Sequence, residues 1–130
     1  MNGTVPAVPR GMTKADELKC RTKAFAIDTI LLCRTLPRSL ETYRLSGQLI
    51  DSATSVAANY RATCRSRSHN EFIAKLGVVI EEADESELWL DILVTLGHCA
   101  QAAEPLRREA DELTAIFVAS SNTARSNRQR

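Results

Sequence analysis

Glycine and proline are scarce in this sequence, at five and four of 130 residues. Most of them lie near the N-terminus or at expected turns, whereas an all-β fold needs turn residues much more often. The apolar fraction of 44% is ordinary for a folded protein, and 130 residues suffice for one domain with its own core. The scarcity of turn residues therefore argues against an all-β fold.

No run of apolar residues approaches the length of a transmembrane helix, about 20 residues. The opening residues, MNGTVPAVPRG, lack the apolar core of a signal peptide. The four cysteines, Cys20, Cys33, Cys64 and Cys99, form no CxxC pair and have no histidine at zinc-ligand spacing. We expect a cytoplasmic protein with free thiols, and we expect no membrane segment, disulfide, metal or other cofactor.

Few acids occur in some long parts of the chain and few bases in others, although the net charge is only +1. Residues 34–75 hold seven Lys or Arg against three Asp or Glu, a local charge of +4. Residues 76–112 hold two against ten, a local charge of −8, and the last eighteen residues contain three arginines and no acid. Such asymmetry indicates either a nucleic-acid face beside an acidic body or charges that pair between neighbouring helices.

Apolar residues at steps of three and four predict four helices. The first ends before Pro37, because the residue preceding a proline disfavours helical backbone. The second follows Ser39, a suitable N-cap. Ser68 and Glu71 have the spacing of a capping box and predict the start of the third helix, which is expected to end at Gly97. The expected helices cover about residues 13–35, 40–66, 68–97 and 101–122.

The third helix has the most regular apolar seam, a heptad pattern typical of helices that pack at shallow angles. Its positions are Phe72, Leu76, Val79, Ala83, Ser86, Leu90, Leu93 and Gly97. The fourth helix repeats the steps at Leu106, Ala110, Leu113, Phe117 and Ser120. Four helices with short connections predict an all-α fold, an antiparallel up-down-up-down four-helix bundle over residues 13–123. Residues 1–12 are expected to be a flexible arm, and residues 124–130 a basic flexible tail.

A second apolar face on the third helix exceeds what an isolated bundle needs. Leu88, Trp89, Ile92 and Leu96 lie off the seam, and a helix that is apolar on two faces is buried on two faces. We interpret these residues as a subunit interface anchored by Trp89. The alternative is a thick core within one subunit that leaves a leucine exposed.

Residues suited to catalysis or metal binding are sparse. Di-metal carboxylate sites in helix bundles need Glu-x-x-His on two helices, but Ser66 and Thr95 precede His69 and His98 at that spacing. The run EEADESE (81–87) is interpreted as a solvated or salt-bridging face. Glu87 lies nearest the core and is expected to meet a basic residue, for example an arginine of the second helix. Without a GxSxG turn or a glycine-rich phosphate loop, we expect no enzyme.

Arginines concentrate where the second and third helices are expected to meet. Arg61, Arg65 and Arg67, with Arg44 and Lys75 nearby in sequence, carry groups suited to phosphate. In an oligomer this patch would be repeated, and affinity for nucleic acid grows with the number of charges neutralised. From the residues alone, a nucleic-acid site and a solvated helical turn are both open.

Several segments together resemble one protein family. The run of small residues into Ala57-Ala58-Asn59, the arginine-rich turn and a helix that opens with Glu71-Phe72 are distinctive in combination. The chain resembles the four-helix-bundle family named for a protein encoded in intervening sequences of bacterial 23S ribosomal RNA genes, over about residues 14–123. The resembling segments are 25–37, 45–63 (LSGQLIDSATSVAANYRAT), 66–93 and 109–117 (EADELTAIF).

The resemblance implies a homo-oligomeric ring, commonly a pentamer, with no established catalytic activity. In a related branch, the accessory protein of diversity-generating retroelements, a similar bundle binds nucleic acid and a reverse transcriptase. Carried over, this places nucleic-acid contacts on Arg61, Arg65, Arg67 and Lys75. We therefore expect a non-enzymatic adaptor that binds itself, the backbone of RNA or DNA through the arginine-rich turn and the basic tail, and a protein such as a reverse transcriptase. The alternatives are a protein-binding scaffold without nucleic-acid contact and, third, a metal-binding bundle.

Overall fold

The structure is a computed structural model that describes residues 11–128. This range folds into four α-helices and the connections between them. The helices are α1 (Lys14–Thr35), α2 (Leu40–Thr63), α3 (His69–Thr95) and α4 (Ala100–Arg128). No strand occurs within this range, which confirms the all-α prediction there. Residues 1–10 of the expected arm and residues 129–130 of the expected tail lie outside the described residues.

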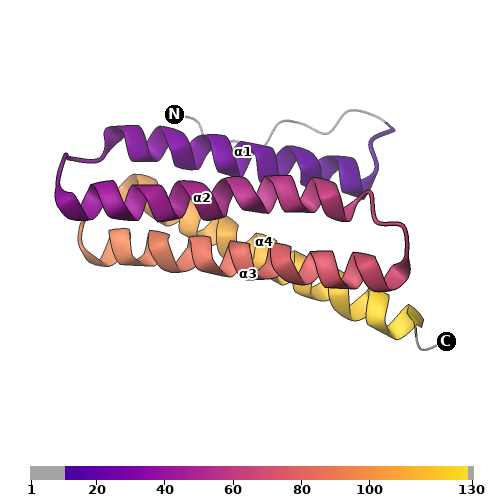
Figure 1. The fold of residues 1–130 in the computed structure, drawn as a ribbon. Helices are drawn as coiled ribbons and strands as arrows, with labels where there is room; N and C mark the ends of the chain where they lie inside the picture. Colours follow the sequence, from indigo (N-terminus) through magenta and orange to yellow (C-terminus); the bar gives the residue numbers. More distant parts are fainter. Residues whose placement is uncertain (1–10, 129–130) are drawn as a thin grey trace.

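The helices form a closed cycle of contacts, in which α1 packs on α2, α2 on α3, α3 on α4 and α4 on α1. The α1–α2 and α3–α4 connections lie at one end of the molecule, here called the α1–α2 end (Figure 1). The α2–α3 connection lies at the opposite end, called the α2–α3 end, where α4 extends past its neighbours (Figure 1). Between residues 11 and 128, no helix is both long and apolar enough to cross a membrane.

Side-chain caps define the starts of α2 and α3. Ser39 accepts a hydrogen bond from the Thr42 amide at 3.1 Å, as predicted for an N-cap. Ser68 likewise accepts from the Glu71 amide at 3.0 Å. The return bond of the predicted capping box is not made, and the Glu71 carboxylate lies 3.0 Å from Lys75 Nζ instead.

α3 ends in a turn that depends on Gly97. The φ angle of Gly97 is +80°, in the left-handed region that favours glycine. Its amide donates to the Val94 carbonyl at 3.0 Å, and the His98 amide donates to the Leu93 carbonyl at 2.9 Å. These are the two bonds of a Schellman motif. The helix therefore stops at Thr95 and Gly97 forms the turn after it.

α4 continues to Arg128, so the predicted helix end at Asn122 is wrong. The buried seam does not end on Ser120, which is only partly buried, but passes through Ser121 and Ala124, each 6% exposed. Because both side chains are small, they keep α4 packed against its neighbours where the sequence looks polar. The expected flexible tail over residues 124–130 is thus helical as far as Arg128.

Small side chains bring α2 and α3 together in the middle of the bundle. Ser52 and Ala53 of α2 and Ala83 and Ser86 of α3 are at most 2% exposed. The two serine hydroxyl oxygens lie 2.8 Å apart. Each is also within hydrogen-bonding distance of a carbonyl one turn earlier in its own helix, at 3.2 Å for Ser52 and 2.9 Å for Ser86. Burial therefore leaves neither hydroxyl without a partner.

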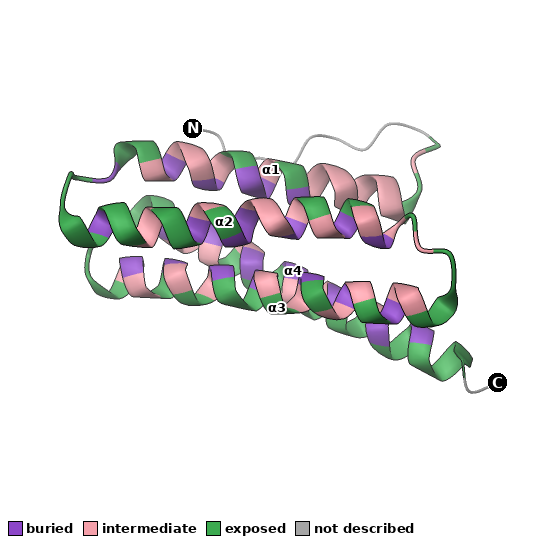
Figure 2. Ribbon diagram, viewed as in Figure 1, coloured by how far each residue is buried: buried purple, intermediate pink, exposed green. Residues whose placement is uncertain are grey.

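Larger apolar side chains fill the rest of the core, on the inward faces that Figure 2 shows as buried. The Tyr60 ring of α2 lies 5.3 Å from the Phe117 ring of α4, centroid to centroid. Burial raises the pKa of the Tyr60 hydroxyl. Other fully or nearly fully buried members are Phe25, Leu32, Leu49, Val56, Leu76, Val79, Leu90, Leu93, Leu106 and Leu113.

Ser86→Leu is expected to lower the free energy of unfolding by about 1–3 kcal/mol, because it forces a larger side chain into the contact with Ser52. Ala74→Leu, at an exposed position of the same helix, is the matched control and should change stability by less than about 0.5 kcal/mol. Urea unfolding followed by circular dichroism measures both variants. If Ser86→Leu and the wild-type protein have the same free energy of unfolding, the α2–α3 contact can accommodate a larger side chain.

Candidate nucleic-acid interface

The three arginines predicted to contact nucleic acid lie together at the α2–α3 end. Arg61 belongs to the last turn of α2, and Arg65 and Arg67 belong to the connection that follows. All three side chains are exposed. None of them forms a salt bridge with an acid of residues 11–128. Their guanidinium groups therefore face solvent without a counter-charge from this part of the chain.

Lys75, the fourth predicted contact, lies in α3 and is partly buried. Its ammonium group is 3.0 Å from the Glu71 carboxylate, one helical turn away. This pairing offsets part of the lysine's charge, although exposed ion pairs of this kind are weak. Lys75 is thus less available to an anion than the three arginines.

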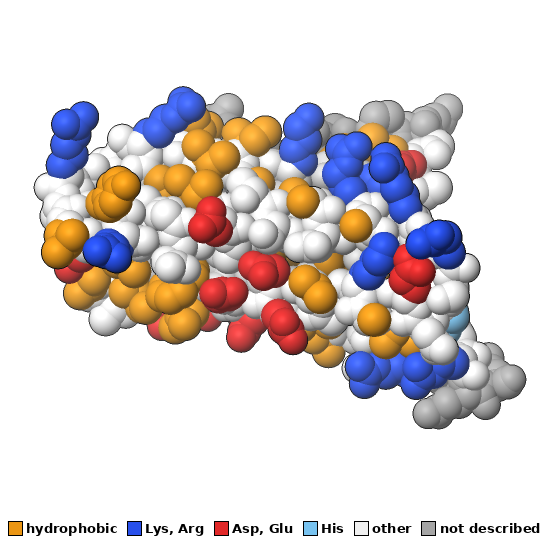
Figure 3. Space-filling view, in the orientation of Figure 1, with side chains coloured by type: hydrophobic (Ala, Val, Ile, Leu, Met, Phe, Trp, Pro, Cys, Tyr) orange, Lys and Arg blue, Asp and Glu red, His pale blue; other side chains and the backbone are white. Residues whose placement is uncertain are grey.

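The end of α4 adds two cations that the predicted set of contacts lacks. His69 Nε2 lies 2.6 Å from the Ala124 carbonyl, and Arg128 Nη1 donates to Asn70 Oδ1 at 3.2 Å. These bonds hold the last turns of α4 against the start of α3, and Arg125 and Arg128 are exposed there. Figure 3 shows Lys and Arg side chains gathered at this end. We call the following set the basic end: Arg61, Arg65, Arg67, Lys75, Arg125 and Arg128.

Arg44 does not belong to this cluster, so the expectation that it gathers with the other arginines is wrong. It lies near the start of α2, whereas Arg61 lies in the last turn. A helix of 24 residues spans about 36 Å at a rise of about 1.5 Å per residue. Arg44 therefore lies at the α1–α2 end.

The sequence profile of the 23S rRNA-intervening sequence protein family matches residues 16–119. The chain belongs to this family. A crystal structure of a protein with unknown function from the S23 ribosomal protein family of Bacteroides thetaiotaomicron has a similar fold. It is 26% identical, with a TM-score of 0.75, and the match covers 85% of this chain and 99% of that chain. No curated protein matches the chain.

Membership in the 23S rRNA-intervening sequence protein family confirms the resemblance expected from the sequence segments. The matched residues include Arg61 of α2, Arg65 and Arg67 of the α2–α3 connection, and the apolar face of α3. They stop at residue 119, so Arg125 and Arg128 lie beyond the family match. The family match thus includes Arg61, Arg65, Arg67 and Lys75 of the basic end, whereas the two remaining arginines lie in the last turns of α4.

The four residues predicted as a subunit interface differ in exposure. Leu88 and Leu96 are 47% and 50% exposed, whereas Trp89 and Ile92 are partly buried. Trp89 packs against the core of its own subunit. Its buried Nε1 has no hydrogen-bond partner among the residues that the structure describes. Trp89 is therefore part of the subunit's own packing, and the two leucines are the apolar side chains that face outward.

Opposite charges pair across helices elsewhere in the bundle. Arg107 Nη1 of α4 lies 3.1 Å from Glu87, so the expectation of an arginine from the second helix is wrong. The same guanidinium donates to Glu104 at 2.9 and 2.6 Å and holds the pKa of that carboxyl below its usual range. Arg21 of α1 donates to Glu109 of α4 at 3.3 and 2.5 Å. These pairs connect α4 to both of its neighbours.

Glu81, Glu82 and Glu85 of α3 lie close to Asp51 of α2, and these four acids are here called the acidic band. Burial raises the pKa of Glu82, and the nearby charges of Glu85, Glu81 and Asp51 raise it further. Between residues 11 and 128, no cluster of three or more His, Cys, Asp or Glu side chains has the geometry to hold a metal ion. The negative charge of the acidic band repels polyanions.

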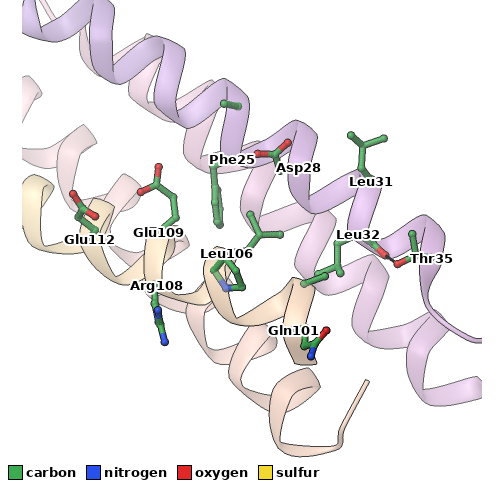
Figure 4. A pocket seen from close by; sticks show the side chains of 13 residues that line it. Phe25, Asp28, Leu31, Leu32, Thr35, Gln101, Leu106, Arg108, Glu109 and Glu112 are labelled. Atoms are coloured by element: carbon green, nitrogen blue, oxygen red, sulfur yellow. Dashed lines mark hydrogen bonds between the residues drawn. The ribbon is translucent and has the colours of Figure 1, made fainter. Parts of the chain in front are cut away.

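A groove of about 610 Å³ separates parts of α1 and α4. Phe25 and Leu32 of α1 and Leu106 of α4 lie along it (Figure 4). Burial raises the pKa of Asp28 on its wall. No histidine or cysteine is among the lining residues. Its ionisable lining residues are the carboxylates Asp28, Glu109 and Glu112 and the guanidinium group of Arg108.

Glu82→Gln is expected to raise the urea midpoint at pH 7. A carboxyl whose pKa is raised by folding destabilises the fold when ionised, and protonation removes this effect. The gain should therefore disappear as the pH falls through the pKa of Glu82 in the folded protein. Asp111→Asn, which removes an exposed acid of α4, is the control and should show no comparable gain. A pH-independent gain from Glu82→Gln would contradict the electrostatic explanation.

Proposed function

We propose that the protein is a non-enzymatic adaptor that binds the phosphate backbone of nucleic acid through the basic end. The supporting observation is the convergence of six cations from α2, α3 and α4 at one end of the bundle. Arg61, Arg65 and Arg67 are exposed there and form no salt bridge within residues 11–128. Guanidinium groups bind phosphate oxygens in bidentate geometry, so arginine is the residue suited to this contact.

The charge distribution favours binding by the end of the molecule over binding by its side. The acidic band of Asp51, Glu81, Glu82 and Glu85 lies between the two ends, and red side chains occupy the middle of the face in Figure 3. A polyanion that approaches this face is repelled from the middle and attracted to the basic end. The family name associates these proteins with 23S rRNA intervening sequences, and RNA is therefore the first ligand to test.

A ring of identical subunits would repeat the basic end and strengthen its hold on one polyanion. We propose that the up-down-up-down bundle assembles in the cytoplasm as such a homo-oligomeric ring, pentameric by resemblance. Leu88 and Leu96 would supply outward apolar contacts to the neighbouring subunit, with Ile92 beside them. A protein partner such as a reverse transcriptase would then bind the assembled ring. The competing function is a protein-binding scaffold that makes no nucleic-acid contact.

Arg61/Arg65/Arg67→Ala is expected to weaken binding of labelled single-stranded RNA at least tenfold at low salt. Each phosphate contact contributes about 0.7 to the slope of log K against log salt for single strands. The variant should therefore have a slope shallower by about 2. Fluorescence anisotropy at several salt concentrations measures both quantities for single- and double-stranded RNA and DNA.

Lys23/Arg108→Ala removes two exposed cations from α1 and α4, away from the α2–α3 end, and is the control for this test. It should keep nearly the wild-type affinity and slope. Equal losses in the two variants would show that net charge alone drives binding. Absence of binding by the wild-type protein at low salt would favour the scaffold function.

Leu88→Lys/Leu96→Lys is expected to reduce the assembly to a smaller species in light scattering after size-exclusion chromatography. The two leucines are mostly outside the subunit core, so the variant should still fold, whereas Trp89 variants would also disturb that core. Ile27→Lys/Val118→Lys, at sites 46% and 40% exposed on α1 and α4, is the control and should keep the wild-type mass. A lower mass of the control variant alone would indicate that the subunit interface lies on α1 and α4.

A further inference from the structure

The start of α2 displays the two most exposed large apolar side chains of residues 11–128. Leu40 is 75% exposed and Tyr43 is 78% exposed. The turn beneath them is firmly built, since the Tyr43 amide donates to the Ser39 carbonyl at 3.1 Å and Thr42 Oγ1 donates to the Pro37 carbonyl at 2.5 Å. A planar ring held out from a rigid turn can meet a ligand with little loss of conformational entropy.

Three exposed arginines lie in the same part of the fold, and two of them, Arg34 and Arg38, line a hollow together with Tyr43. Arg34 lies in the last turn of α1, Arg38 in the connection, and Arg44 directly after Tyr43. As far as residues 11–128 are concerned, none of the three forms a salt bridge. Figure 3 shows hydrophobic side chains beside Lys and Arg side chains at the α1–α2 end. We call the following set the tyrosine tip: Arg34, Arg38, Tyr43 and Arg44.

The one acid of this turn is engaged by another element. Glu41 Oε1 lies 3.0 Å from Nε2 of His98, which follows α3. The three arginines and this one carboxylate sum to a formal charge of +2, so positive charge is in excess near Tyr43. The tyrosine tip is therefore complementary to a polyanion.

A hollow of about 690 Å³ lies beside the ring. Arg34, Arg38 and Tyr43 line it together with the hydroxyl-bearing Ser39 and Ser46. The hollow thus combines an aromatic surface, two guanidinium groups and small polar side chains. Ligand sites commonly occupy volumes of about 300–1,000 Å³, so the space can hold a planar base.

We propose that the tyrosine tip binds single-stranded nucleic acid, with a base stacked on Tyr43 and the adjoining phosphates on Arg34 and Arg38. Exposed aromatic rings beside basic side chains are the usual means of single-strand binding. In a duplex the faces of the bases are already stacked, so a protruding tyrosine has little to contact. The basic end differs, because its tyrosine, Tyr60, is 7% exposed and belongs to the core. The tip is thus a separate site with its own preference for single strands.

Photo-cross-linking of the full-length protein tests this assignment. A single-stranded oligonucleotide that contains 5-bromouracil is irradiated with the protein at low salt, and the mixture is digested with trypsin. Cleavage after Arg38 and Arg44 places Tyr43 on the short peptide Ser39–Arg44, which mass spectrometry separates from the peptides of the basic end. We expect a cross-link on this peptide with the single strand and at least a tenfold lower yield with the matching duplex.

Variants at the exposed positions separate stacking from general charge. Tyr43→Ala should lower the cross-link yield on this peptide and weaken single-strand binding about tenfold, whereas Tyr43→Phe, which keeps a ring, should restore binding. Leu40→Ala, at an equally exposed neighbouring site, is the matched control and should leave affinity unchanged. Arg34/Arg38→Gln, measured by anisotropy, should weaken binding and reduce the salt slope by about 1.

The outcomes distinguish this proposal from the one on the basic end. Cross-links confined to peptides of the basic end, with affinity unaffected by Tyr43→Ala, overturn the tip and leave the adaptor function intact. Cross-links on Ser39–Arg44 that persist in Arg61/Arg65/Arg67→Ala support single-strand binding at the tyrosine tip, independently of whether the basic end binds nucleic acid. Without any single-strand binding at low salt the proposal for the tip falls, and the proposal for the basic end falls as well if duplexes are not bound either.

Two further results would assign the tyrosine tip to a protein contact and also overturn the proposal. One is a smaller oligomer for Tyr43→Ala with an unchanged cross-link yield on other peptides, which indicates contact between copies of the chain. The other is binding of a glutamate-rich helical peptide that Tyr43→Ala abolishes, without any oligonucleotide cross-link on the tip. Circular dichroism confirms that each variant is folded.

Discussion

The contact of α2 with α3 at Ser52 and Ser86 determines how the rest of the bundle is arranged. Small side chains let the two helices approach, and the hydroxyl pair at 2.8 Å fixes their relative register. The connection joins the adjacent ends of α2 and α3 and so places Arg65 and Arg67 at the α2–α3 end. α4 is then held to α3 by Arg107 near its start and by the His69–Ala124 bond near its end.

The two ends of the bundle are both basic but differ chemically. The basic end offers guanidinium groups without an exposed aromatic ring, which suits phosphate in any conformation. The tyrosine tip adds an exposed ring, which suits unstacked bases. The length of α2, about 36 Å, separates the two ends. Between them lies the acidic band, with Glu81, Glu82 and Glu85. A nucleic-acid strand that bound both ends of one subunit would therefore pass along another face of the bundle.

Local rules made much of the fold predictable, because caps and seams depend on residues close in sequence. Ser39 and Ser68 were identifiable as N-caps, and the heptad seam of α3 predicted its buried positions. The end of α4 was not predictable in this way, since Ser121 and Ala124 are buried only because other helices lie over them. Likewise, nothing local indicates that Glu87 meets Arg107, or that Arg44 lies about 26 Å along α2 from Arg61. The tyrosine tip had a sequence signal, Tyr43 between Arg38 and Arg44, but its exposure depends on the tertiary arrangement.

The partly buried indole of Trp89 gives the protein an internal reporter. It is the only tryptophan of the chain, and it packs on the core directly beside the outward-facing Leu88. Indole emission shifts to longer wavelengths when water reaches the ring. The intrinsic fluorescence of the unlabelled protein therefore responds both to unfolding of the subunit and to exposure of the α3 face when subunits separate. Separation of subunits depends on protein concentration, whereas unfolding of one subunit does not, so the two changes can be told apart.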